Sequence, residues 1–66
     1  MNSKEKAKII TDTLKTFLDM DLIESANDKK YAAGLVVFYM KKGRLSEKQI
    51  TIGRKLAVRL IVGHTL

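Results

Sequence analysis

The 66-residue chain contains no cysteine, no proline and no tryptophan, and it has one histidine, His64. A disulfide framework is therefore excluded, and one histidine cannot supply the ligands of a structural zinc site. No apolar run reaches the roughly 20 residues that a membrane-spanning helix needs, and the first residues lack the apolar stretch of a signal peptide. We expect a single domain over residues 1–66, in the cytoplasm, that depends on its hydrophobic core for stability.

Acidic residues are scarce in the second half of the chain. Residues 1–28 hold four lysines and six acids, whereas residues 29–66 hold nine Lys and Arg residues and only one acid, Glu47. The net charge of +6 thus comes from a balance of −2 in the first part and +8 in the second. Such an asymmetry favours a polyanionic partner for the second half, although a solvated basic surface has the same composition.

The first helix is predicted from about residue 4 to residue 17 or 18, with Ser3 as its N-cap. Its apolar residues recur at steps of three and four, as one face of a helix requires. They are Ala7, Ile10, Leu14 and Phe17.

The stretch 31–40, Tyr-Ala-Ala-Gly-Leu-Val-Val-Phe-Tyr-Met, is the longest uncharged part of the chain. Placed on a helix, its apolar side chains cover nearly every direction, a pattern typical of a helix buried by its neighbours. Leu35 to Tyr39 also have strand propensity, so the pattern alone leaves the type of element open. We expect this stretch to form a central helix that has Asn27 or Asp28 as its N-cap and runs to about Lys42.

The residues that follow favour the helical interpretation. Lys41 and Lys42 suit the last turn of a helix, and Gly43 is the natural left-handed residue after it. Ser46 and Gln49 then form the Ser-x-x-Gln capping box of a new helix. Stop signal, short turn and start signal together predict a helical hairpin. The residues around the turn depart from the sequence pattern of a helix-turn-helix motif that reads the major groove.

The third helix is predicted from about Glu47 to Val62, ended by Gly63. Its expected core side consists of Ile50, Gly53, Leu56, Ala57, Leu60 and Ile61. Because Gly53 and Ala57 are small and four residues apart, we expect this helix to approach the central one closely. The fold class predicted is therefore all-α, a small three-helix bundle with a C-terminal helical hairpin.

The segment 18–26 fits two interpretations, a strand-like alternation and a fourth short helix near residues 20–26 with Asp21 and Glu24 as its capping box. Its carboxylates do not indicate catalysis, because no nucleophile, glycine loop or second set of ligands accompanies them. His64 is the only histidine in the sequence, so no second histidine is available as a metal ligand. We expect no enzymatic activity, no catalytic residues, no cofactor and no metal site.

The distribution of basic residues is the feature of the sequence that indicates a binding function. On the hairpin and on the outer side of the third helix they are Lys41, Lys42, Arg44, Lys48, Lys55 and Arg59. Cations along one ridge bind phosphates independently of sequence, so we expect these six to be nucleic-acid ligands. Tyr31 and Tyr39 are candidates for stacking on bases, although a half-buried place in the core explains both as well.

The segment from Phe38 to Gln49, with the pattern Lys-Lys-Gly-x-Leu-Ser-x-Lys-Gln, resembles a helical hairpin that recurs in phage DNA-metabolism proteins. With its size and charge, the chain is similar over residues 31–60 to the small accessory proteins encoded beside the recombination helicase of T4-like phages. The resemblance implies work with DNA in phage recombination, repair or replication, in the host cytoplasm, with a phage helicase or another replication protein as a partner.

The function expected from the sequence is thus sequence-independent binding of nucleic acid, with a preference for single-stranded DNA. The alternative is a small protein-interaction module, an adaptor or inhibitor, that docks the same cations on an acidic surface of a phage or host enzyme. Exposed apolar residues such as Ile52 and Val62 would favour this alternative.

Overall fold

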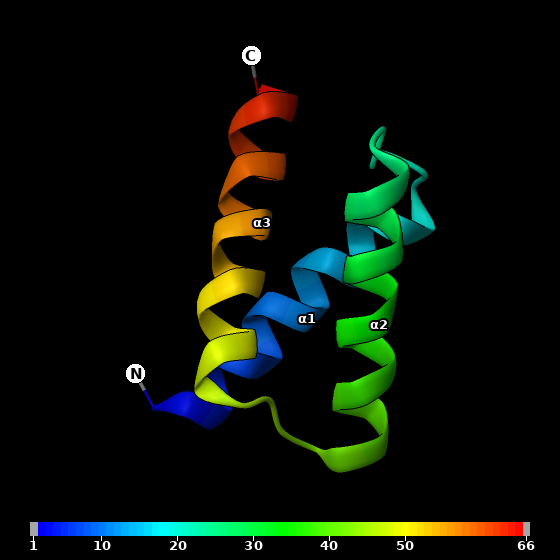
Figure 1. Cartoon of the computed structure of the whole chain (residues 1–66). Coiled ribbons are helices and arrows are strands. Elements are labelled where there is room, and N and C mark those ends of the chain that lie inside the picture. The colour runs from blue at the N-terminus through cyan, green and yellow to red at the C-terminus, as the bar shows by residue number, and fades with distance from the viewer. Residues whose placement is uncertain (1, 66) are drawn as a thin grey trace.

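The computed structural model describes residues 2–65, and for residues 64 and 65 it describes the backbone alone. It contains the helices α1 (Ser3–Asp19), α2 (Ala26–Lys42) and α3 (Glu47–Thr65), as Figure 1 shows. Within the described residues no strand is present. The predicted all-α three-helix fold with its C-terminal hairpin is confirmed, whereas the fourth helix considered near residues 20–26 is not formed. The side chain of His64 lies outside the described residues.

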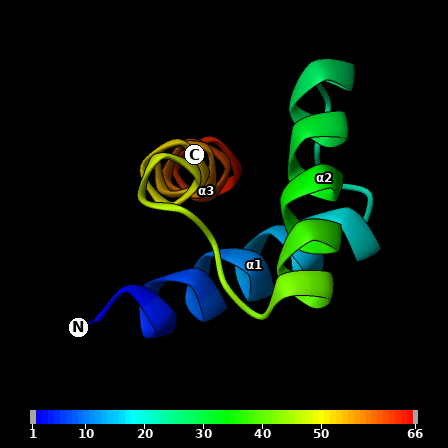
Figure 2. The same cartoon turned by 60° about the horizontal axis from the view of Figure 1, so that its bottom comes forward.

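The first helix, α1, is the element that organises the molecule. The hairpin helices α2 and α3 run in opposite directions in the view of Figure 1, but they are steeply inclined to each other, since Figure 2 shows α3 end-on and α2 lengthwise. The helix α1 crosses one side of the pair (Figures 1 and 2). Extensive contacts join α1 to both helices, while α2 and α3 contact each other much less. The prediction that residues 31–40 form the central helix was therefore wrong.

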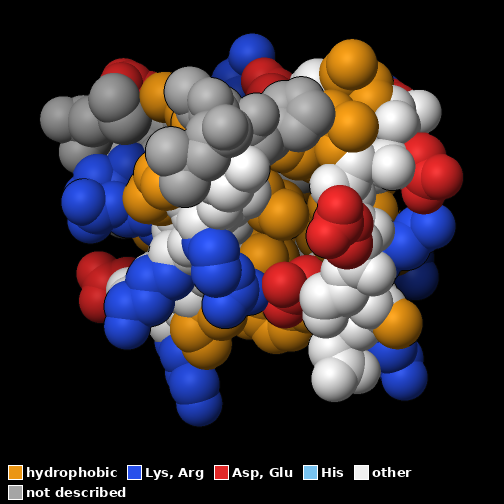
Figure 3. Space-filling model, turned by 90° about the horizontal axis from the view of Figure 1, so that it is seen from above, with side chains coloured by type: hydrophobic (Ala, Val, Ile, Leu, Met, Phe, Trp, Pro, Cys, Tyr) orange, Lys and Arg blue, Asp and Glu red, His pale blue; other side chains and the backbone are white. Residues whose placement is uncertain are grey.

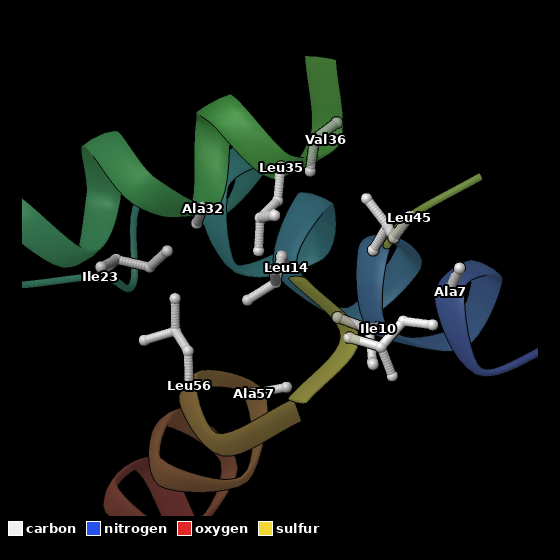
Figure 4. Close-up of a cluster of buried hydrophobic side chains, with 11 residues drawn as sticks. Ala7, Ile10, Leu14, Ile23, Ala32, Leu35, Val36, Leu45, Leu56 and Ala57 are labelled. Atoms are coloured by element: carbon white, nitrogen blue, oxygen red, sulfur yellow. The ribbon is translucent and has the colours of Figure 1, made fainter. Parts of the chain in front are cut away.

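One apolar cluster joins the three helices and the two connecting loops. Its fully or nearly buried members are Ala7, Ile10, Leu14, Ile23, Ala32, Leu35, Val36, Leu45, Ile50, Leu56 and Ala57, most of which are labelled in Figure 4. Leu14 has 0% of its surface exposed and lies near the middle of the cluster (Figure 4). Phe17 and Leu60 pack against the cluster from its edge. The apolar face predicted for the first helix is thus the face that is buried.

The helix α2 is buried on one side only. Ala32, Leu35 and Val36 face the core, whereas Val37 and Met40 are exposed, Met40 at 73%. An apolar sequence in all directions indicated a helix covered on every side, but only α1 and part of α3 are available to cover it. Uncovered apolar surface therefore remains on this helix.

The helix α1 begins and ends differently from the sequence prediction. Asn2, not Ser3, is the N-cap, and its Oδ1 accepts a hydrogen bond of 2.8 Å from the amide of Glu5. At the other end the amide of Leu22 donates to the carbonyl of Phe17 at 2.9 Å, and Asp21 adopts a left-handed conformation with φ of 54°. These features form a Schellman motif, which ends the helix and turns the chain into the loop.

Two other helix boundaries also differ. The N-cap of α2 is Ser25, whose Oγ accepts from the amide of Asp28 at 3.4 Å, so the helix starts before the expected caps Asn27 and Asp28. At the end of the chain α3 continues through Gly63 to Thr65, so Gly63 does not end it.

At Gly53 the helix α3 lies close to both other helices. A Cβ atom at this position would lie 2.9 Å from Cγ2 of Ile10 on α1 and 3.1 Å from Cδ1 of Leu35 on α2. The expected close approach is therefore present, and it involves α1 as well as α2. Ile61, expected on the same core side, is exposed instead.

A pair of glycine substitutions tests this contact. Gly34→Ala on α2 meets nothing within 4 Å and should stabilise the protein by up to about 1 kcal/mol through helix propensity. Gly53→Ala has the same propensity gain, but it pushes on the stiff β-branched side chain of Ile10, so we expect a net loss of about 1 kcal/mol. Urea denaturation of both variants measures the difference. Equal stabilisation by the two alanines would contradict the close packing at Gly53.

Candidate nucleic-acid interface

The hairpin turn displays four of the predicted cations on a well-fixed backbone. Gly43 has φ of 71°, and its amide donates to the carbonyl of Tyr39 at 2.7 Å, which ends α2 directly after Lys41 and Lys42. A positive φ strains any residue with a Cβ, so glycine is the suitable residue here. Leu45 is buried and anchors the turn to the core, whereas Arg44 beside it is exposed.

The start of α3 is fixed by the predicted capping box. The amide of Ser46 donates to Oε1 of Gln49 at 2.8 Å, and the amide of Gln49 donates to Oγ of Ser46 at 3.1 Å. Lys48 therefore has a defined place in the first turn. Leu45 and Ile50, on the two sides of the cap, are both buried, as expected of a hydrophobic staple.

The cations of the turn are free to meet a ligand. Lys41, Lys42, Arg44 and Lys48 are all exposed, and none of them takes part in an ion pair found among the described residues. A ligand that binds at these positions therefore does not have to break one of these ion pairs. We refer to these four residues as the basic turn.

The remaining two cations lie further along α3. Lys48, Lys55 and Arg59 follow one line along the helix, and Lys48 and Arg59 are separated by about 16 Å of helix, at 1.5 Å per residue. The chain reverses at the hairpin turn, so Arg59 lies near the start of α2, and its Nη2 is 2.9 Å from Oδ2 of Asp28. Arg59 is thus partly neutralised, and the six cations do not form one compact patch.

Charges of both signs are visible at this far end of the bundle. Figure 3, viewed along the bundle towards the end where α3 finishes and α2 starts, shows Lys and Arg side chains over α3 and Asp and Glu side chains towards α2. The electrostatic field that attracts an anion should therefore be strongest at the opposite end, at the basic turn.

The aromatic side chains divide into exposed and half-buried ones. Tyr31 and Phe38 are each more than a third exposed and line a hollow of about 400 Å³ that is completed by Gln49 of α3. Tyr31 also lines a neighbouring hollow together with Ile52, Lys55 and Arg59. Tyr39, the other predicted stacking residue, packs against the core.

Phe38 was missed by the sequence analysis. It occurs seven residues after Tyr31 and therefore on the same side of α2, but that side was expected to be buried. The uneven covering of α2 by its neighbours, which sequence does not reveal, is what exposes it.

Two of the three carboxylates in the segment 18–26 are paired with lysines. Asp19 lies 3.9 Å from Nζ of Lys15, and Asp21 lies 3.3 Å from Nζ of Lys29. Among the residues that the structure describes, no group of three or more potential ligands is placed to hold a metal ion. None of the helices that the structure describes is long and apolar enough to cross a membrane.

Comparisons with protein-family models, curated proteins and solved structures found no match to this chain.

Proposed function

We propose that this protein binds nucleic acid independently of sequence, without catalysis, through the phosphates of the backbone. The observation that carries the proposal is the basic turn, four exposed cations that form no ion pair with a described residue and are held by a left-handed glycine and a capping box. Neutralising phosphates releases condensed counterions, which is the main source of affinity in sequence-independent binding. Lys55 and Arg59 extend the interface along α3.

Single-stranded DNA is the preferred ligand in this proposal. Duplex DNA offers phosphates but keeps its bases stacked, whereas a single strand can also place its bases on aromatic side chains. Tyr31 and Phe38 are exposed on α2. Tyr31 shares a hollow with Ile52 and Lys55 of α3, and Phe38 shares one with Gln49 of α3. Such a ligand is consistent with the resemblance to phage accessory proteins, and with a role in recombination, repair or replication beside a helicase.

The alternative remains a protein-interaction module that docks the same cations on an acidic enzyme surface. The exposure of Ile52 and Val62 favours it, because exposed apolar side chains are common at protein interfaces. The two functions differ in their dependence on salt.

Fluorescence anisotropy with labelled single- and double-stranded oligonucleotides tests the proposal. Four to six phosphate contacts predict a slope of roughly −3 to −4 for log affinity against log salt, at about 0.7 per contact. Between 50 and 200 mM salt the affinity should thus fall roughly 50- to 300-fold. Absence of binding at the lower salt concentration would exclude the nucleic-acid function, and equal affinity for both strand forms would exclude the stacking role.

A further inference from the structure

A second surface lies between α1 and α3, away from the basic turn. An open groove of about 680 Å³ runs along α3 and includes Lys6 of α1 on its other wall. A smaller hollow continues it and is lined by Lys6, Ile9, Ile10 and Arg54. The two share Lys6 and Arg54, so we treat them as one feature, the α1–α3 groove.

Exposed aliphatic side chains give this groove its apolar part. Ile9, Val58 and Val62 are each about half exposed. Arg54, Val58 and Val62 are spaced at four residues and so form one row along α3, about 12 Å long at 1.5 Å per residue. Apolar surface gathered in this way commonly marks a site where another molecule binds.

Cations surround the two valines of this row, and one of these cations, Arg54, begins the row. Lys6, Arg54, Lys55 and Arg59 line the groove, and none of its described lining residues is acidic. Among these four cations, only Arg59 takes part in an ion pair found in the described part of the chain. A ligand that fits must therefore combine an aliphatic strip with flanking negative charge.

We propose that the α1–α3 groove binds an acidic amphipathic helix of a partner protein. A 12 Å row matches about two turns, so the partner presents aliphatic residues at positions i, i+4 and i+7 and carboxylates on both sides of them. None of the described residues that line the groove has an aromatic side chain on which a base could stack. A second copy of this chain also fits poorly, because its net charge of +6 would bring cations against cations.

An NMR titration tests the proposal directly. The ¹⁵N-labelled protein is titrated with a blocked peptide of about 15 residues, carrying Leu at i, i+4 and i+7, Glu on both flanks and Ala elsewhere. We expect saturable shifts at the amides of residues 6, 9, 54, 58 and 62 with a micromolar Kd, and none with the same peptide carrying Lys in place of Glu. Absence of shifts at about 1 mM peptide would mean that the Kd is well above 1 mM, and this result overturns the proposal.

Matched variants locate the site. Val58→Asp should weaken peptide binding at least tenfold, whereas Val37→Asp, on α2, should leave it unchanged, because Val58 lines the groove and Val37 does not. The two valines are a matched pair, since Val37 is 49% exposed and Val58 52% exposed. Circular dichroism establishes that both variants fold. Equal effects of the two substitutions, or a dimer of the protein alone that the peptide dissociates, overturn the assignment of this groove to a partner helix.

A crossed pair of arginine variants separates this inference from the proposed function. Arg54→Glu should lose the peptide but keep an oligonucleotide, and Arg44→Glu should lose the oligonucleotide but keep the peptide. If no oligonucleotide binds at all, the proposed function fails while the groove assignment stands on the peptide result. If each variant loses both ligands, one shared surface binds them and the separate groove is disproved.

Discussion

Replacing Lys41, Lys42 and Arg44 together with glutamate is expected to weaken single-stranded DNA binding by more than about 100-fold at low salt. Three phosphate contacts are lost, which lowers the salt slope by roughly 2, and three negative charges are placed where phosphates would approach. The three changes also reduce the net charge from +6 to 0, since each replaces a charge of +1 with −1. Anisotropy at several salt concentrations measures both the affinity and the slope.

The control is a variant with the same net charge and an intact basic turn. Lys4, Lys8 and Lys15 are exposed on α1, and their replacement by glutamate also brings the net charge to 0. We expect this control to retain most of its salt slope. If both triple variants lose affinity equally, binding depends on overall charge, and the basic turn is not the site. Thermal melts of both are needed, because glutamate at positions 41 and 42 opposes the dipole of α2.

Leu14→Ala is expected to cost about 2–5 kcal/mol of unfolding free energy, the largest stability loss of any single substitution considered. Leu14 is completely buried where the three helices meet, so its truncation leaves a cavity as well as losing burial (Figure 4). The whole domain has a stability of about 3–10 kcal/mol, at roughly 0.05–0.15 kcal/mol per residue. The variant should therefore be largely unfolded or melt at a much lower temperature in circular dichroism.

Met40→Ala provides the comparison for this loss. Met40 is an apolar residue of similar size on α2, but it is 73% exposed, and its truncation should change the stability by less than about 0.5 kcal/mol. Similar melting temperatures for the two variants would mean that the core is not formed around Leu14.

The parts of the fold that sequence predicted well are those fixed by local hydrogen bonds. Gly43 and the Ser46–Gln49 capping box specify the hairpin within a few residues, and both are present as expected. Helix starts were less predictable, because several capping residues follow one another. In both cases an earlier residue is the cap, Asn2 in place of the predicted Ser3 and Ser25 in place of the predicted Asn27 or Asp28.

The tertiary arrangement was not predictable in the same way. Apolar residues in all directions on residues 31–40 suggested a central helix, yet the central position belongs to the ordinary amphipathic helix α1. Amphipathicity shows which face of a helix is buried, but not how many neighbours share that face. The number of neighbours decides which apolar residues, such as Phe38 and Met40, stay exposed.

In the candidate site, too, features set by neighbouring residues were predictable, and contacts between distant parts of the chain were not. Charge and helical spacing placed Lys41, Lys42 and Lys48 on the outside, where the structure has them. The pairing of Arg59 with Asp28 depends on where α3 meets the start of α2, which no local pattern contains. The α1–α3 groove was missed because Lys6 and Arg54 are far apart in the sequence.

The meeting of α1, α2 and α3 at Gly53 has a consequence for how the chain folds. The hairpin helices have little contact of their own, so the turn that joins them cannot hold them together without α1. The helix α1, in turn, packs against both helices of the hairpin. We therefore expect no pair of helices to be a stable intermediate, and the domain should form and unfold in one cooperative step.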